Sequence, residues 1–174
     1  ELPAIRFAYQ LAITEGNQKF DDIFALEERL HAARAAMELR SAGNKLAARF
    51  IKTVGSAVRP KSAKAWARYA EGSNGNKHQY TVSYAVFCAL NGIRLDDCML
   101  SYAYGQLSAM VVNCVKIIPL SQTTGQNLLF SLHEDIVRAI EAAEQLPERR
   151  FLQAAPGFAL RAMQHEALYS RIYM

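Results

Sequence analysis

The residues of this sequence that could carry acid–base or metal chemistry are scattered along the chain. Its four histidines are His31, His78, His133 and His165. The stretch His133-Glu134-Asp135 places an imidazole beside carboxylates. A metal-binding helix face needs ligands three or four positions apart, whereas these three residues are consecutive. We therefore interpret them as solvated helix positions and predict no metal site.

Motifs for nucleophilic or nucleotide chemistry are also absent from the sequence. No serine lies in a Gly-x-Ser-x-Gly elbow. Neither GxGxxG nor GxxxxGK[ST] occurs, so no known phosphate-binding loop is predicted. The carboxylate pairs Asp21-Asp22 and Asp96-Asp97 lie where helices are expected to begin, and negative charge stabilises a helix N-terminus. We predict a protein that is not an enzyme and that binds no cofactor directly.

Cysteine usage and the absence of sorting signals bear on location. Cys88, Cys98 and Cys114 form no CxxC pair, so neither a disulfide framework nor a zinc knuckle is predicted. Cys88 and Cys114 lie in apolar runs, where cysteine acts as a small hydrophobe. No apolar stretch approaches the roughly 20 residues of a membrane span, and no secretory leader is visible. We expect a reduced, cytoplasmic protein whose natural N-terminus lies before Glu1.

The formal net charge is +4 and the pI is near 9.0, which raises the question of nucleic acid. One predicted helical stretch holds a run of basic residues: Arg34, Arg40, Lys45, Arg49 and Lys52. They do not cluster as a nucleic-acid-binding stripe would require. The pattern favours a solvated helix face, and an acidic partner protein would suit the same charge.

The elements that must position these residues are all predicted to be helices. With 174 residues, 51% hydrophobic and 21% charged, the chain can form one domain with a sizeable core. Apolar residues recur at three- and four-residue spacing, and sustained strand alternation is missing. We predict a single all-α domain over residues 1–174, a bundle of seven or eight helices. The predicted helices cover residues 4–14, 21–32, 35–54, 63–71, 81–90, 97–118, 121–146 and 157–168.

Two of these helices carry more detailed expectations. In the helix over residues 35–54, the inward stripe is predicted to be Leu39, Leu46, Phe50 and Val54, with Gly55 and Pro60 ending the helix. The helix over residues 97–118 gathers apolar side chains on one face, with Tyr102, Tyr104 and Gln106 at its rim. Tyrosines are typical of interfaces, although an ordinary core helix with boundary tyrosines explains the pattern equally well.

A polar break joins two predicted helices at residues 112–126. The first helix runs into Lys116 and Pro119, and the second opens with small hydroxyl, amide and glycine residues. Proline cannot continue a helix, so the chain turns there. A turn this polar between two strongly helical stretches is typical of a surface presented to another protein. Residues 163–174 are a second such candidate, because they are rich in Tyr, Met, Leu and Arg where chain ends are usually polar.

These segments resemble one known family. The matching stretches are Glu38-Leu39-Arg40, Asn44-Lys45-Leu46, Arg49-Phe50-Ile51-Lys52-Thr53, Ser83-Tyr84, Gly92-Ile93, Tyr102-x-Tyr104-x-Gln106, Asn113-x-x-Lys116-x-x-Pro119-Leu120-Ser121-Gln122-x-x-Gly125-Gln126, and Ala162-Met163-Gln164-His165-Glu166 to Leu168-Tyr169-Ser170-Arg171. They span nearly the whole chain in order. The chain is similar to the urease accessory protein F (UreF) family, and its tail most resembles that of Helicobacter-type members. The family's opening Pro-x-Gly…His-Ser-x-Gly-Leu-Glu stretch is expected to lie before Glu1.

The resemblance implies an all-α, non-enzymatic protein that takes part in inserting nickel into urease. Family members form homodimers and bind the accessory protein D, called H in some bacteria. That complex recruits the nickel-carrying GTPase UreG and acts on the urease apoprotein. Members have been proposed to modulate the GTPase or to guard the fidelity of activation. Nickel and GTP are then handled by the partners, and neither nucleic acid nor a membrane is an expected partner.

The resemblance also implies partner-binding residues. From the polar break, the partner-facing surface would include Lys116, Pro119, Leu120, Gln122, Gly125 and Gln126. Tyr104 and its helix are the candidate homodimer face. Residues 163–174 are the candidate docking tail for the D/H partner, and the residues expected to bind there are His165, Glu166, Leu168, Tyr169, Arg171 and Tyr173.

Functions of other classes stay open at this point. A basic all-α nucleic-acid-binding module would explain the pI, and salt-dependent DNA binding would support it. A different kind of protein-interaction module fits the same exposed features. A helical metal-dependent enzyme would need clustered carboxylates and histidines that project into the bundle core.

Overall fold

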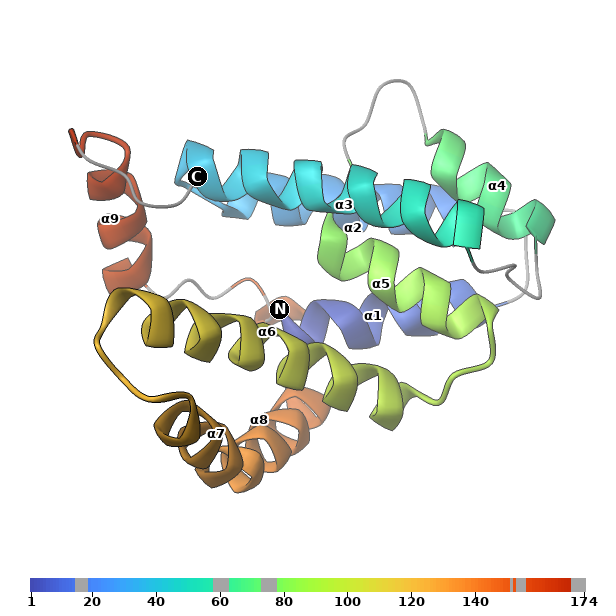
Figure 1. Ribbon diagram of the computed structural model, residues 1–174. Coiled ribbons are helices and arrows are strands. Elements are labelled where there is room, and N and C mark those ends of the chain that lie inside the picture. The colour runs from blue at the N-terminus through green and yellow to red at the C-terminus, as the bar shows by residue number, and fades with distance from the viewer. Residues whose placement is uncertain (15–18, 58–62, 73–77, 151, 153–155, 170–174) are drawn as a thin grey trace.

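The computed structural model is a bundle of helices (Figure 1). It describes residues 1–14, 19–57, 63–72, 78–150, 152 and 156–169. The regular structure in these ranges is entirely helical, which confirms the predicted all-α fold. In chain order the elements are α1 (Leu2–Ile13), α2 (Lys19–Ala33), α3 (Met37–Ala57), α4 (Ala63–Glu71), α5 (Tyr80–Leu90), α6 (Leu95–Ile117), α7 (Gln122–Ser131), α8 (His133–Gln145), the 3-10 turn η1 (Glu148–Arg150) and α9 (Pro156–His165).

Helix α5 forms the centre of the bundle because it carries no charged side chain. Val82, Ala85 and Val86 of this helix are fully buried. A helix that is apolar on nearly every side must be covered by neighbours, and α1, α3, α4 and α6 pack around it (Figure 1). Gly92, just after α5, has a φ of 69°, a left-handed conformation that glycine adopts without strain. This glycine therefore lets the chain turn from α5 towards α6.

Helix α1 packs against the central helix α5 and also contacts α8, which lies late in the sequence. The face of α1 that is buried consists largely of the small residues Ala4, Ala8 and Ala12. On the opposite side, the two terminal nitrogens of Arg6 donate to the backbone carbonyls of Glu144 and Leu146 at the end of α8. The last carbonyls of a helix lack partners within the helix, so this arginine satisfies them and fastens α8 to α1.

An aromatic cluster fastens α3 and α4 to α5. Phe50 of α3 is surrounded by Trp66, Tyr80, Tyr84 and Phe87, with ring centroids 6.5, 5.5, 5.8 and 5.6 Å away, respectively. The contacts to Trp66, Tyr80 and Phe87 are edge-to-face, an arrangement that aromatic rings favour. Phe50, predicted to face inward, therefore occupies a central packing position.

The predicted single helix over residues 121–146 is two helices, α7 and α8. Leu132 between them has a ψ of −2°, and the Ser131 hydroxyl donates to the carbonyl of Leu128 at 2.8 Å. Such a bond from serine to a nearby helix carbonyl tends to bend the helix. Both short helices pack against α6, so Leu129 and Ile136 are buried, whereas one straight helix would run past the bundle.

Three local predictions of burial or helix ends were wrong. Leu46 is 46% exposed, because the inner face of α3 passes through the fully buried Ala47 instead. Gly55 lies inside α3, since one glycine weakens a helix by about 1 kcal/mol without ending it. Pro60 lies outside the described residues. Cys114 is exposed, unlike the buried Cys88, because the end of α6 extends past the bundle core.

Within the described ranges, no helix is long and apolar enough to cross a lipid bilayer.

Candidate partner-binding surfaces

The turn between α6 and α7 is built by backbone and capping bonds. Ile118 leaves the helix in an extended conformation, with φ −99° and ψ 138°, immediately before Pro119. Ser121 then begins α7 as its N-cap, and its hydroxyl oxygen accepts a hydrogen bond from the backbone N–H of Thr124 at 3.0 Å. Capping of this kind satisfies a backbone donor that has no helical partner. The turn therefore has a defined shape rather than that of a passive linker.

The polar break divides into exposed and buried members. Lys116, Pro119, Gln122 and Gln126 are exposed, and Leu120 is half-buried. Next to them, Ile117 and Ile118 are 54% and 48% exposed. The tip of the turn thus presents apolar side chains framed by a cation and two amides.

Gly125 has a different place from the rest of the break. It is buried, and a Cβ atom added there would lie 2.7 Å from Cγ2 of Val115 and 3.4 Å from Cγ1 of Val111. Real Cβ atoms essentially never come within 3.0 Å of a non-bonded heavy atom from elsewhere in the chain. Glycine at this position lets α7 approach α6 closely, so the structure gives Gly125 a role in packing.

Tyr104 lies in a small aromatic patch with Phe130 and His133. The ring of His133 is 6.2 Å from that of Tyr104 and 5.1 Å from that of Phe130. Tyr104 is 42% exposed and Phe130 is 74% exposed. Helices α6, α7 and α8 each contribute one of these residues, so the patch exists only because α7 and α8 fold back on α6.

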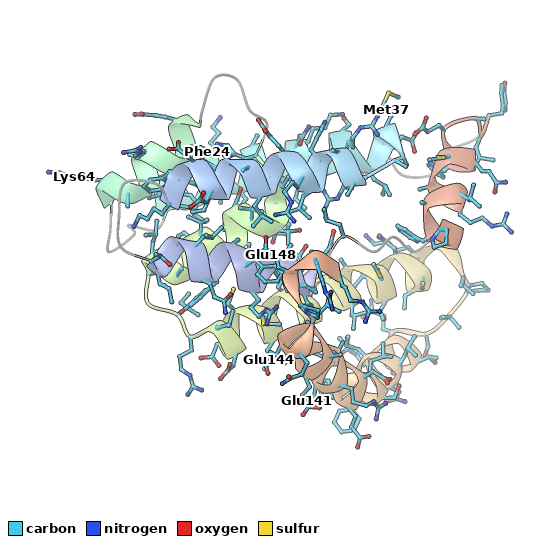
Figure 2. All side chains as sticks on the ribbon, turned by 180° about the vertical axis from the view of Figure 1, so that it is seen from behind. Phe24, Met37, Lys64, Glu141, Glu144 and Glu148 are labelled. Atoms are coloured by element: carbon cyan, nitrogen blue, oxygen red, sulfur yellow. The ribbon has the colours of Figure 1, made fainter. Side chains whose placement is uncertain are left out.

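Residues 165 and 166 bind to the bundle through the start of α3. The Glu166 carboxylate accepts from the backbone N–H groups of Met37 at 2.7 Å and of Glu38 at 3.4 Å. In return, the Glu38 carboxylate lies 2.7 Å from Nδ1 of His165. Figure 2 shows Met37 at the end of α3 that α9 approaches. Glu166 therefore caps a helix far away in sequence, and this pair fixes α9 relative to α3.

The rest of the tail is exposed as far as the structure describes it. Leu168 is 52% exposed and Tyr169 is 106% exposed. In α9 itself, Phe158, Leu160 and Met163 are 62%, 59% and 41% exposed. Arg171 and Tyr173 lie outside the described residues. Among the described elements, α9 packs chiefly on α3, where the His165 and Glu166 contacts hold it.

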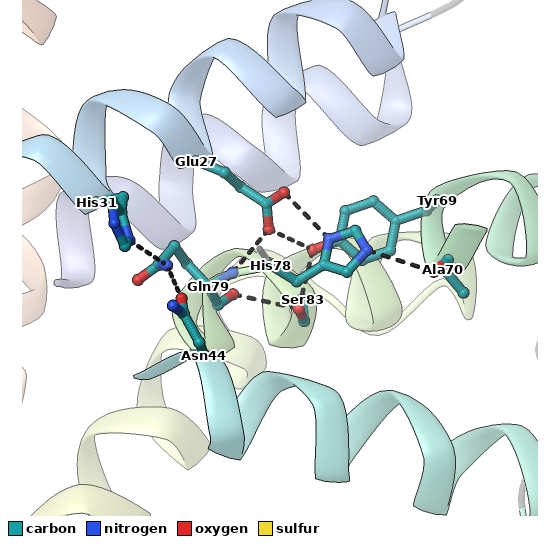
Figure 3. Close-up of polar contacts among 8 residues, drawn as sticks. All are labelled: Glu27, His31, Asn44, Tyr69, Ala70, His78, Gln79 and Ser83. Carbon is teal, nitrogen blue, oxygen red and sulfur yellow. Dashed lines mark hydrogen bonds and ion pairs between the residues drawn. The ribbon is translucent and has the colours of Figure 1, made fainter. Parts of the chain in front are cut away.

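A buried polar network, formed by Glu27, Tyr69, His78, Gln79 and Ser83, holds the start of α5 against α2 and α4 (Figure 3). Glu27 is 1% exposed. Its Oε1 accepts from the Tyr69 hydroxyl at 2.7 Å and from the Gln79 backbone N–H at 2.9 Å. Its Oε2 lies 3.1 Å from Nδ1 of His78. The Tyr69 and Ser83 hydroxyl oxygens are 2.9 Å apart.

This network raises the pKa of His78 and of Tyr69. Burial alone lowers the pKa of His78, but the hydrogen bond and the negative charge of Glu27 outweigh burial and raise that pKa above its usual value. Burial raises the pKa of the Tyr69 hydroxyl well above its usual value, and the charge of Glu27 adds to this effect. Tyr69 therefore stays a proton donor, and the network stabilises the fold.

The UreF family model matches residues 1–133 of this chain. The chain belongs to the UreF family. The match takes in α1 to α7 and the polar break between α6 and α7. Membership of this family supports a urease accessory role in a maturation complex.

Individual relatives are similar over more of the chain than the family model. A urease accessory protein UreF of Haemophilus influenzae is 32% identical over 166 residues, which cover 94% of this chain and 68% of the relative. One of Actinobacillus pleuropneumoniae is 29% identical over 161 residues, covering 91% and 69%. One of Paenarthrobacter aurescens is 26% identical over 153 residues, covering 88% and 68%.

The structure brings only some of the predicted UreF surface residues together. Tyr104 belongs to the aromatic patch, the break forms the α6–α7 turn, and His165 and Glu166 lie at α3. In the described ranges, no three His, Cys, Asp or Glu side chains are grouped so that they could hold a metal ion. Of the basic run, Arg34 pairs with Glu1 at 2.8 Å, and Arg40 donates to backbone carbonyls.

Sequence reasoning missed the buried network around Glu27, although a signal was present. Glu27 follows Phe20, Ile23 and Phe24 at the three- and four-residue spacing of the buried face of α2. An acid at such a position must be buried with partners. The partners themselves could not be inferred, because Tyr69 and Gln79 lie on other helices.

Proposed function

We propose that this chain is a non-catalytic adaptor of urease maturation that binds other proteins through α6 to α9. It forms a homodimer, binds the accessory protein D/H and recruits the GTPase UreG, so that nickel enters the urease apoprotein. Nickel and GTP are held by these partners and not by the chain itself. The adaptor acts in the cytoplasm, with neither nucleic acid nor a membrane as a partner.

The exposure of large apolar side chains on the second half of the chain supports this proposal. Helices α6 to α8 and the turn between α6 and α7 expose Leu100, Tyr104, Met110, Val112, Ile117, Ile118, Leu128, Phe130 and Val137. Exposed apolar side chains that gather into a patch mark sites where proteins associate, and the rings of Tyr104 and Phe130 gather at His133. Aromatic anchors such as Tyr104 and Phe130 commonly supply much of the binding energy.

In this proposal three surfaces have separate roles. The aromatic patch of Tyr104, Phe130 and His133 is the homodimer face. The turn from Lys116 to Gln126 contacts the partners that bring nickel. The tail from Met163 onward, including Tyr169, binds the D/H protein.

The dimer face is tested by Tyr104→Asp, which places a charge in the middle of the aromatic patch. We expect the variant to elute as a monomer in size-exclusion chromatography with light scattering. Ile13→Asp is a matched control, because Ile13 is also exposed, at 58%, but lies on α1. If Tyr104→Asp remains dimeric, the assignment of this face is wrong.

The complex is tested by co-purification with the D/H protein and UreG, scored by activation of urease apoprotein in the presence of nickel. Tyr169→Ala combined with Arg171→Ala should reduce capture of the D/H protein, while Arg161→Ala on the exposed face of α9 should not. Lys116→Glu should reduce urease activation while the fold, measured by circular dichroism, is unchanged. Full activation by a chain that captures neither partner would refute the adaptor role.

A further inference from the structure

A basic pocket of about 470 Å³ lies between the end of α2 and the first half of α3. None of its lining residues is acidic, and they are His31, Met37, Arg40, Ser41, Asn44 and Lys45. The five from α3 recur at three- and four-residue spacing, so they share one face of that helix. The pocket therefore combines two permanent cations with an imidazole, a hydroxyl and an amide.

Arg34 determines which groups donate and which accept hydrogen bonds at the back of this pocket. An arginine can only donate, and its Nη1 donates to Oε1 of Gln79 at 2.7 Å. The Gln79 amide nitrogen is therefore left to donate, and it does so to Oδ1 of Asn44 (Figure 3). It also lies 3.5 Å from Nδ1 of His31. Gln79 is fully buried, so water does not compete for these hydrogen bonds.

These hydrogen bonds leave Asn44 and His31 with donor groups that face the pocket. Because Asn44 uses its oxygen to accept, its NH₂ group is left to donate into the pocket. Because Nδ1 of His31 accepts, the ring carries its proton on Nε2 and can donate there as well. Gly43 makes this arrangement possible, since a Cβ atom at that position would lie 2.4 Å from Nη1 of Arg34.

The two cations of the pocket are placed differently. Nη1 of Arg40 donates to the carbonyls of Arg34 and Ala35, each at 2.6 Å, which fixes the guanidinium at the end of α2. Its Nε and Nη2 have no partner within the described part of the chain, and neither does the ammonium of Lys45. The pocket thus offers donors from five side chains and no competing carboxylate in its lining.

Three carboxylates that contact residues beside the pocket are engaged by other groups. Glu38 points to His165, and Glu166 accepts from the backbone at Met37. Glu1 is bound to Arg34 at 2.8 Å. Their hydrogen bonds hold these charges outside the pocket lining.

We propose that this pocket binds a phosphate group, either as inorganic phosphate or as part of a small phosphate ester. A phosphate carries close to two negative charges and three acceptor oxygens, which matches two cations and several converging donors. A single carboxylate would leave part of this donor set unused. The fixed guanidinium of Arg40 supplies the planar fork that binds oxyanions, and Lys45 adds a mobile charge.

Isothermal titration calorimetry of the whole chain with sodium phosphate tests the proposal, with sodium chloride added to keep ionic strength equal. We expect saturable binding that Lys45→Gln weakens at least about tenfold, the loss of one charge-assisted bond. Asn44→Asp should also weaken it, because it puts a negative charge in the pocket while keeping the acceptor for Gln79. Arg49→Gln is the matched control, since Arg49 is an exposed cation of α3 outside the pocket. Circular dichroism melting confirms that each variant is folded.

Three results would overturn the proposal. The first is a dissociation constant weaker than about 10 mM, which is indistinguishable from general ion association. The second is an equal loss of binding in Arg49→Gln, which would mean that overall charge and not the pocket attracts phosphate. The third is acetate binding as tightly as phosphate. If phosphate binds, the titration is repeated with glycerol 3-phosphate. Tighter binding of glycerol 3-phosphate would identify a phosphate ester as the ligand, and tighter binding of inorganic phosphate would identify the free anion. Both results support the site.

Discussion

Replacing Glu27 by glutamine removes the negative charge from the buried network that joins α2, α4 and α5. Glutamine keeps an oxygen that can accept from Tyr69 and from the Gln79 backbone, so the shape of the site is preserved. What is lost is the charge in three hydrogen bonds, at 2.7, 2.9 and 3.1 Å. Charge-assisted bonds contribute about 1.5–3 kcal/mol and neutral ones about 0.5–1.5 kcal/mol.

The expected effect follows from these values. The loss across three bonds is partly offset because a buried charge no longer has to be desolvated. We expect Glu27→Gln to lower the free energy of unfolding by about 2 kcal/mol near pH 6. Glu27→Ala should cost about 3–5 kcal/mol, because it leaves the buried N–H of Gln79 without an acceptor.

The pH dependence gives the sharper test. The pKa of His78 is raised in the folded state. The stability that this contributes is fully present below the unfolded histidine pKa of about 6.5, and it is lost as pH rises through the folded pKa. The wild type should therefore lose more stability than Glu27→Gln when pH is raised from about 6 to about 8.5. Urea unfolding followed by tryptophan fluorescence measures the stability at each pH. Trp66, the only tryptophan, is 5% exposed, and its ring centroid lies 5.6 Å from that of Tyr69.

Glu141→Gln is the matched control, since Glu141 is an exposed glutamate of α8, a helix that contributes no residue to the network. It should leave both the stability and its pH dependence nearly unchanged. If Glu27→Gln retains the full wild-type difference between the two pH values, the Glu27–His78 pair does not act as described.

Two further substitutions test the α6–α7 packing and cap. Gly125→Ala should destabilise by about 1–3 kcal/mol because its Cβ would lie 2.7 Å from Val115, whereas Gly105→Ala, with nothing within 4 Å, should stabilise α6 by up to about 1 kcal/mol. Thermal melts of the two variants should shift in opposite directions, and equal shifts would contradict the close approach of α7 to α6. Ser121→Ala removes the acceptor for the Thr124 N–H and should cost about 1 kcal/mol in urea unfolding, with Ser121→Thr restoring most of it.

Helix existence was predictable because it depends on local periodicity. The extents of α5 and α6 were close to those predicted, since apolar spacing and the Asn91-Gly92 stop are read directly from neighbouring residues. The break between α7 and α8 was not predictable in this way. No proline or glycine interrupts residues 126–146, and the bend at Leu132 exists because both helices must pack on α6.

The candidate surfaces also contain some residues that local sequence could identify and others that depend on tertiary packing. The exposed members of the polar break, Lys116 and Pro119, were identifiable from their residue types beside a helix stop. Gly125 belonged to the same motif but is buried, because only the approach of α7 to Val115 gives this glycine its place. The aromatic patch required α7 and α8 to fold back before Phe130 and His133 could lie beside Tyr104.

The sequence by itself determined the all-α architecture, the turn at Pro119 and the resemblance to the UreF family, because all three depend on residue types at short spacing. The tertiary structure alone decided which polar groups meet. Glu27 finds its partners on α4 and α5, Glu166 caps α3 from the other end of the chain, and Arg34 orients Gln79 at the basic pocket. Hydrogen bonds act over about 3 Å and depend on direction, so distant residues acquire these roles only when the packing of helices fixes their positions.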